Sequence, residues 1–112
     1  MIEVVLLNYL STVLAPIPVY TEIPAERPEK FVTLEKTGGS RMNLLETATI
    51  AFQCWAGSLY EAADLCRTVK SVMDASIALD DISRAEYVSD YNYTDSARKE
   101  YRYQTVYQIT HY

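Results

Sequence analysis

The sequence predicts an α+β fold, with a mixed or antiparallel sheet of about five strands and two helices packed on one face. Three observations predict it. Apolar residues recur at helical spacing in two segments, residues 2–14 and 58–75. Alternating side chains mark strands before and after the second segment, which gives the order α-β-β-β-α-β-β. The 112 residues contain no linker or repeat, so one domain over residues 1–112 is expected.

The first predicted helix, residues 2–14, is amphipathic. Its apolar face consists of residues spaced three and four apart: Ile2, Val5, Leu6, Tyr9, Leu10 and Val13. Pro16 and Pro18 end it, because proline disfavours helical geometry at the preceding residue. The β-branched and aromatic run 19–23 predicts a short strand, and a loop bounded by prolines follows over 24–28.

Two strands that flank a glycine-containing loop are predicted next. The first covers residues 30–36, with Val32 and Leu34 on one face. The second runs from Ala48 to Trp55, and its apolar face carries Ala48, Ile50, Phe52 and Cys54. Between them, residues 37–43 are expected to form a projecting polar tip.

The second helix is predicted over residues 58–75. Ser58 and Glu61 stand at the spacing of a capping box. In this motif the serine side chain accepts a hydrogen bond from the Glu61 backbone N–H, and the glutamate side chain accepts one from the Ser58 backbone N–H. The apolar stripe of this helix is predicted to contain Leu59, Ala62, Ala63, Cys66, Val69, Val72 and Met73.

A final hairpin is predicted from two alternating runs, residues 84–93 and 99–112, with a connection over 76–83 and a turn at 94–97. Tyrosines dominate one face of each run: Tyr87, Ser89, Tyr91 and Tyr93 in the first, and Tyr101, Tyr103, Thr105, Tyr107 and Ile109 in the second. The chain has ten tyrosines. They favour cross-strand packing in a half-buried sheet, and the alternative is a sheet face that meets another subunit.

The composition is that of an acidic globular protein. Ten basic and 15 acidic side chains give a net charge of −5, which disfavours wrapping of nucleic acid. Cys54 and Cys66 are too few and too far apart for a zinc or redox motif, and we expect both to be small buried side chains. The N-terminal apolar run carries Glu3 and is too short to cross a membrane, so a cytosolic chain without a signal peptide is expected.

The residues give no sign of catalytic chemistry. His111 is the single histidine and, next to the last residue, is expected to be solvated or to make a minor contact; one imidazole does not make a metal site. Asp80 and Asp81 are expected to lie in a solvated loop. The pair Gly38-Gly39 lacks the Lys and Ser/Thr of a phosphate-binding loop. The chain is therefore not expected to be an enzyme, and no catalytic residue, cofactor or metal is predicted.

The tip has two interpretations. In the first, its glycines serve only to supply the positive φ that a tight turn needs. Alternatively, the tip is a contact between subunits, because Arg41 on a protruding loop is a good donor to a carboxylate of another copy. In the second interpretation the candidate subunit-interface residues are Lys36, Thr37, Gly38, Gly39, Ser40, Arg41 and Asn43.

Several segments resemble the tail terminator, or tail completion, proteins of long-tailed phages and prophages (siphophages). They are Pro-Val-Tyr-Thr-Glu-Ile-Pro at 18–24, Arg-Pro-Glu-Lys-Phe-Val at 27–32, Lys-Thr-Gly-Gly-Ser-Arg at 36–41, Phe-Gln-Cys-Trp-Ala at 52–56, and the Glu-Ala-Ala-Asp-Leu-Cys pattern within helix 58–75. The resemblance covers nearly the whole chain in element order and is strongest over residues 18–75.

The resemblance implies a structural virion protein that forms a ring, usually of six copies, on the head-proximal end of the tail tube. Its implied partners are other copies of itself, the tail tube protein and the head-tail connector protein, with DNA passing through the lumen without specific binding and no membrane involved. The implied location is the virion tail, reached from the host cytoplasm during assembly. The alternatives are another head-tail joining or minor tail component, and a non-viral cytosolic α+β binding module.

Overall fold

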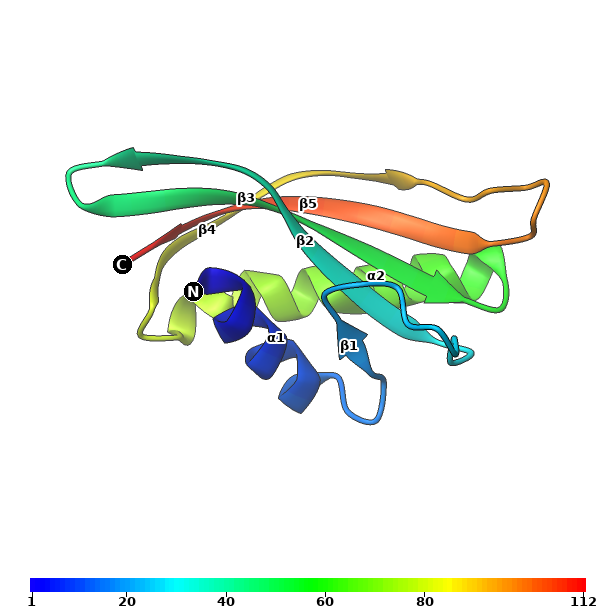
Figure 1. Ribbon diagram of the computed structural model, residues 1–112. Coiled ribbons are helices and arrows are strands. Elements are labelled where there is room, and N and C mark those ends of the chain that lie inside the picture. The colour runs from blue at the N-terminus through cyan, green and yellow to red at the C-terminus, as the bar shows by residue number, and fades with distance from the viewer.

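A five-stranded mixed sheet and two helices form two layers, as the computed structural model of residues 1–112 shows (Figure 1). The elements are α1 (Ile2–Val13), β1 (Val19–Tyr20), β2 (Phe31–Met42), β3 (Leu45–Ala56), α2 (Leu59–Asp74), the 3₁₀ turn η1 (Ala75–Ala78), β4 (Ile82–Asn92) and β5 (Tyr101–His111). This arrangement confirms the predicted α+β class and the order α-β-β-β-α-β-β.

The strand order across the sheet is β1-β2-β3-β5-β4. β1 runs parallel to β2, and the other neighbours are antiparallel. The predicted hairpin of the last two strands is therefore present, and β5 also pairs along β3 from Glu46 to Ala56. β5 thus joins the two halves of the sheet.

Both helices cover the same face of the sheet, as predicted (Figure 1). α1 lies against β1 and β2, whereas α2 crosses β3, β5 and β4. One core of 18 buried residues joins these elements. At its centre Phe52 of β3 meets Tyr107 of β5 edge to face, with ring centroids 6.2 Å apart. Aromatic pairs in this geometry add to the hydrophobic stabilisation of the core.

The helix faces differ in two places from the prediction. In α1 the buried residues are Ile2, Leu6 and Leu10, and Leu14 continues this spacing of four into the core, so Val13 points away from it and is exposed. In α2, Leu59 is exposed and Leu65 is buried instead. The first turn of α2 therefore extends past the sheet, and the core contact begins at Ala62.

The start of α2 carries half of the predicted capping box. The Ser58 Oγ accepts a hydrogen bond from the Glu61 backbone N–H at 3.2 Å, while the Glu61 carboxylate makes no bond to the Ser58 N–H. Ser58→Ala is therefore expected to lower the free energy of unfolding by about 1 kcal/mol. Urea denaturation measures this loss, with Ser58→Thr as a capping-competent control. An unchanged midpoint for Ser58→Ala would show that the cap contributes nothing.

A β-bulge at Val88 corrects the predicted tyrosine face of β4. The register shifts between Tyr87 and Ser89, so the side chains on either side of the bulge no longer share a face. Tyr87 packs on Tyr107 on the helix side, with centroids 5.8 Å apart, whereas Tyr91 and Tyr93 lie together on the other face. Because a bulge adds one residue, it reverses the alternation on which the prediction depended.

The environments of the cysteines and the histidine test three further expectations. Cys54 and Cys66 are free and buried, as predicted. Asp80 and Asp81 are exposed, also as predicted. His111 is not solvated: it is only 6% exposed, because β5 carries it into the sheet opposite Glu46 and Ile82. Its Nε2 has no hydrogen-bond partner.

Tyr107 makes the stability of the core sensitive to alkaline pH. Its hydroxyl donates to Asp74 Oδ1 at 2.7 Å, with Lys70 O as a second acceptor at 3.1 Å. Burial, and then the bond to Asp74, raise the pKa of Tyr107 above its ordinary value. As the pH rises past about 10, the unfolded chain therefore releases this proton before the folded protein does. The stability that Tyr107 contributes is complete below that pH and is lost above it.

Tyr107→Phe is expected to lower the free energy of unfolding by about 1 kcal/mol at neutral pH, through the lost hydrogen bond. The variant should then lose less further stability than the wild type when the pH is raised to about 10.5. Urea denaturation at both pH values checks this, and the other tyrosines are common to both proteins. Equal losses would mean that Tyr107 does not hold its proton.

Candidate functional site

The predicted tip is not a loop but the continuation of the β2–β3 hairpin, which we call the arm (residues 36–47). Residues 37–42 belong to β2 and pair with β3 down to Met42 opposite Leu45. Thr37 forms a bulge, seen as a register shift between Lys36 and Gly38. The predicted loop is wrong because polar, glycine-containing sequence was interpreted as a turn, although the ladder of β3 continues beside it.

The two glycines do not supply turn geometry. Neither has a positive φ; the turn instead uses Asn43 (φ 50°) and Leu44 (φ 69°). A Cβ on Gly38 would meet nothing within 4 Å, whereas one on Gly39 would lie 3.1 Å from Lys36 Cε and 3.3 Å from Thr47 O. Gly39 therefore leaves room for the Lys36 side chain to lie along the arm.

The arm is exposed on both faces and on one edge. Every residue from Glu35 to Met42 is exposed. β1 pairs with β2 only at Val32 and Thr33, so the outer edge of the arm has no neighbouring strand. Six of the seven predicted interface residues, Lys36 to Arg41, line one open hollow of about 480 Å³, and Asn43 lies at the turn. Such an unpaired edge is a ready template for contact with another chain.

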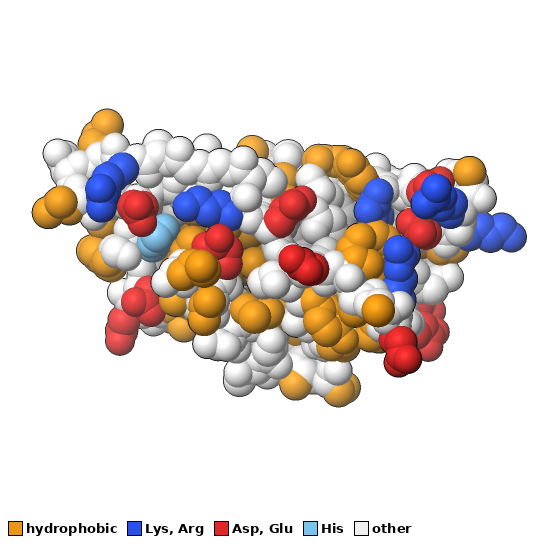
Figure 2. Space-filling view, viewed as in Figure 1, with side chains coloured by type: hydrophobic (Ala, Val, Ile, Leu, Met, Phe, Trp, Pro, Cys, Tyr) orange, Lys and Arg blue, Asp and Glu red, His pale blue; other side chains and the backbone are white.

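The arm tip, residues 41–44, combines a cation with apolar side chains. Met42 is 75% exposed and Leu44 is 86% exposed. Apolar and basic side chains gather at the end of the molecule where Figure 1 places the hairpin (Figure 2). A leucine at positive φ is strained, because its Cβ crowds the backbone. The Leu44 side chain is exposed, so its burial does not offset this strain; backbone strain of this kind clusters at functional sites.

Leu44→Gly is expected to raise the free energy of unfolding by about 1 kcal/mol, because glycine adopts this conformation without strain. The same change removes the exposed apolar side chain and should weaken assembly. Thermal and urea denaturation check the first effect, and light scattering checks the second. Asn43→Gly is the matched control, with little effect on stability, since asparagine already tolerates this conformation. A less stable Leu44→Gly protein would contradict the strain argument.

The second feature is the sheet face opposite the helices, on which a row of stacked side chains crosses all the strands. Phe31 of β2 stacks on Trp55 of β3, with centroids 5.3 Å apart and planes within 6°. The Arg102 guanidinium of β5 lies 4.6 Å from the Trp55 ring and 4.3 Å from the ring of Tyr93, just after β4. Tyr20 of β1 completes the row, 6.1 Å from Phe31. Trp55 is 4% exposed, so this row forms a small second core.

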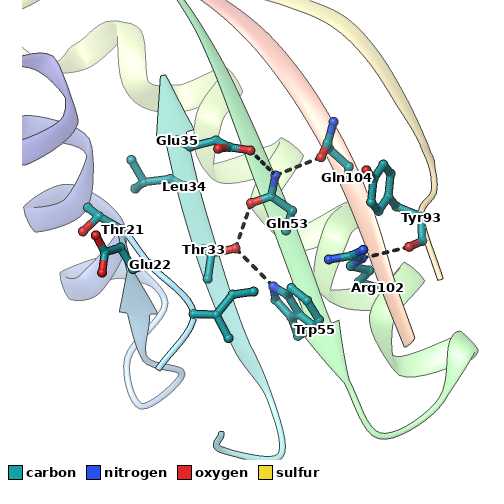
Figure 3. A pocket seen from close by; sticks show the side chains of 11 residues that line it. Thr21, Glu22, Thr33, Leu34, Glu35, Gln53, Trp55, Tyr93, Arg102 and Gln104 are labelled. Carbon is teal, nitrogen blue, oxygen red and sulfur yellow. Dashed lines mark hydrogen bonds between the residues drawn. The ribbon is translucent and has the colours of Figure 1, made fainter. Parts of the chain in front are cut away.

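A chain of hydrogen bonds lies beside this row (Figure 3). Trp55 Nε1 donates to Thr33 Oγ1 at 3.1 Å, and Thr33 Oγ1 donates to Gln53 Oε1 at 2.8 Å. Gln53 Nε2 donates to Glu35 Oε1 at 3.1 Å and to Gln104 Oε1 at 2.8 Å. The buried Gln53 amide is fully satisfied, and it fixes the Glu35 carboxylate at the rim of the face.

These side chains form the floor of a pocket of about 410 Å³, which we call the face pocket. The segment after β1 contributes Glu22 and Ile23 to the lining of this pocket. Ile23 is 47% exposed. Glu22 and Glu35 both line the pocket, and neither forms an ion pair within the chain. The pocket therefore presents two free carboxylates beside apolar surface.

Sequence reasoning did not identify the face pocket. The alternation of β3 and β5 placed Gln53, Trp55, Arg102 and Gln104 away from the core, and that placement is confirmed. What alternation does not give is the register, which brings Gln53 opposite Gln104 and Trp55 opposite Arg102. The signal that was available is the unusual presence of large polar and aromatic side chains on the same non-core face.

The remaining chemistry of the chain is sparse. No group of three or more His, Cys, Asp or Glu side chains lies close enough to hold a metal ion. Burial raises the pKa of the Cys54 thiol well above its ordinary value, so Cys54 stays a protonated core side chain. Neither helix has the length and apolar character that a membrane crossing requires.

Comparisons with known proteins found no relative for this chain: no family model matches it, and no curated protein matches it significantly.

Proposed function

We propose that this protein is a structural component of a phage or prophage virion, a tail terminator. In this role it forms a ring of six copies. The ring caps the head-proximal end of the tail tube and joins it to the head connector. DNA passes through the lumen of the ring without specific binding. The protein assembles in the host cytoplasm and resides in the virion tail, and it acts through contacts rather than catalysis.

The arm is the observation that carries this proposal. The β2 half of this hairpin is exposed from Glu35 to Met42, and the hairpin is strained at an apolar turn residue, Leu44. Its free edge and exposed tip suit a contact with another protein chain. The resemblance of residues 18–75 to tail terminators supports the identity of the assembly.

The two free edges of the sheet favour a ring over a symmetric dimer. The outer edge of β2 is free beyond Thr33, and the outer edge of β4 at the opposite side of the sheet is also free. The two edges differ in sequence, bulges and charge. Contacts between unlike surfaces are head-to-tail, and they close into rings when the rotation between copies allows it.

Light scattering coupled to gel filtration tests this proposal over a series of protein concentrations, with negative-stain images of any large species. We expect rings of about six copies. The same protein is then added to tail tubes growing in vitro, where it should stop their elongation. A protein that forms no ring and leaves tube growth unchanged overturns the proposal. Labelling of its position in assembled virions separates a terminator from another neck component.

A further inference from the structure

We infer that the face pocket is the receptor for the arm tip of a neighbouring copy, with Arg41 of one copy held by Glu22 and Glu35 of the next. This inference rests on the proposed self-assembly and goes beyond it, because it assigns both halves of the contact. The occupant is a second copy of this chain.

The charges on the two surfaces are complementary and unused. Five ion pairs form within the chain, and none involves Arg41, Glu22 or Glu35. Arg41 is the single charged residue between positions 37 and 45. Glu46 lies opposite Arg41 in the ladder, yet the two make no ion pair. The Arg41 guanidinium is therefore free to reach a carboxylate of another copy.

The apolar parts of the two surfaces also match. Met42 comes just before the turn of the arm tip, Leu44 lies within it, and both side chains are strongly exposed. Ile23 forms an exposed wall of the face pocket, and the stacked Trp55 lies in its floor. The pocket volume of about 410 Å³ falls in the range of sites that bury a small group of atoms. Arginine and tryptophan, present here as Arg41 and Trp55, are among the residue types enriched in contacts that dominate binding energy.

The receptor is built before any partner arrives. Gln53 donates to one oxygen of Glu35, and the other oxygen of that carboxylate has no hydrogen bond. Gln53 itself is held by Thr33 and Gln104 (Figure 3). A guanidinium is a planar fork that binds carboxylates through paired hydrogen bonds, so a fixed carboxylate favours arginine over lysine.

The arm tip cannot reach the face pocket of its own chain. Glu35 and Arg41 lie on the same strand and are held extended by pairing with β3. Six residues of strand separate them by roughly 20 Å. The contact is therefore between copies, and because it joins two different surfaces, it is head-to-tail and compatible with a closed ring.

A charge exchange tests the inference. Arg41→Glu and Glu35→Arg each place like charges across the contact, and each is expected to raise the concentration for half-assembly by about tenfold or more. The double variant restores opposite charges and should assemble near the wild-type concentration. The control is Glu26→Arg, an exposed carboxylate outside the pocket. It should assemble normally and should not rescue Arg41→Glu.

The outcomes separate this inference from the proposed function. If the wild type forms rings and Glu35→Arg does so equally well, the face pocket is not the receptor, and the proposed function stands. If both single variants fail and the double variant also fails, the two residues do not meet, and the inference is wrong. If the wild type stays monomeric even at millimolar concentration, the contact is refuted. The proposed function is then decided by whether the protein stops the elongation of tail tubes. Circular dichroism confirms that each variant is folded.

Discussion

Arg41→Glu is expected to leave the protein folded and to weaken its proposed assembly into rings by about tenfold or more. Arg41 is exposed and makes no ion pair in the monomer, so its replacement should change the melting temperature little. In the assembly, the new carboxylate would face an acidic chain, since the protein carries a net charge of −5. Repulsion then replaces attraction at every contact of the ring.

Light scattering and thermal denaturation measure the two effects of Arg41→Glu on the same samples. Arg67→Glu is the matched control, because it makes the same change of charge at an exposed position of α2, away from the arm. It should form rings. Normal ring formation by Arg41→Glu would show that Arg41 of the arm takes no part in contacts between copies. If the variant failed to fold, its failure to assemble would say nothing about the arm.

Trp55→Ala is expected to give the largest loss of stability on the face opposite the helices. The change removes the centre of the stacked row and the N–H donor to Thr33. Truncation of a buried tryptophan costs about 3–5 kcal/mol. Trp55→Phe keeps an aromatic ring beside Phe31 and Arg102 but lacks the donor, so it should cost less, about 1–2 kcal/mol.

Urea denaturation followed by circular dichroism compares the two variants of Trp55. Fluorescence is unsuitable, because Trp55 is the one tryptophan of the chain. In the wild type, however, the same fact makes fluorescence a specific probe of the face pocket during assembly. Equal and small losses in the free energy of unfolding for both variants would mean that the stacked row does not stabilise the fold as a second core.

Local patterns were sufficient to predict the elements of this fold. Helical spacing identified α1 and α2, and alternation identified the inward faces of β3 and β5, because these faces pack on a single core. Errors arose where geometry departs from a regular repeat. The bulge at Val88 moved Tyr91 and Tyr93 to the face opposite Tyr87, and no residue type in that stretch marks a bulge.

The candidate site could be predicted only in part. The seven residues proposed for the interface do lie together on an exposed hairpin, but residues 37–42, predicted as a loop, belong to strand β2. The face pocket depends on long-range register between β3 and β5 and on the segment after β1 folding back beside the sheet. Neither is encoded in neighbouring residues, so spacing alone does not reveal them.

The central place of β5 has a consequence for how the chain folds as it is made. β5 lies between β3 and β4, although it is synthesised after both. Until residues 101–111 leave the ribosome, β3 and β4 each present an unpaired edge, and α2 has only part of its platform. The nascent chain therefore completes its sheet last at the centre. Contacts so distant in sequence slow folding and expose intermediates to aggregation, so timely pairing of β5 with β3 and β4 protects the new chain.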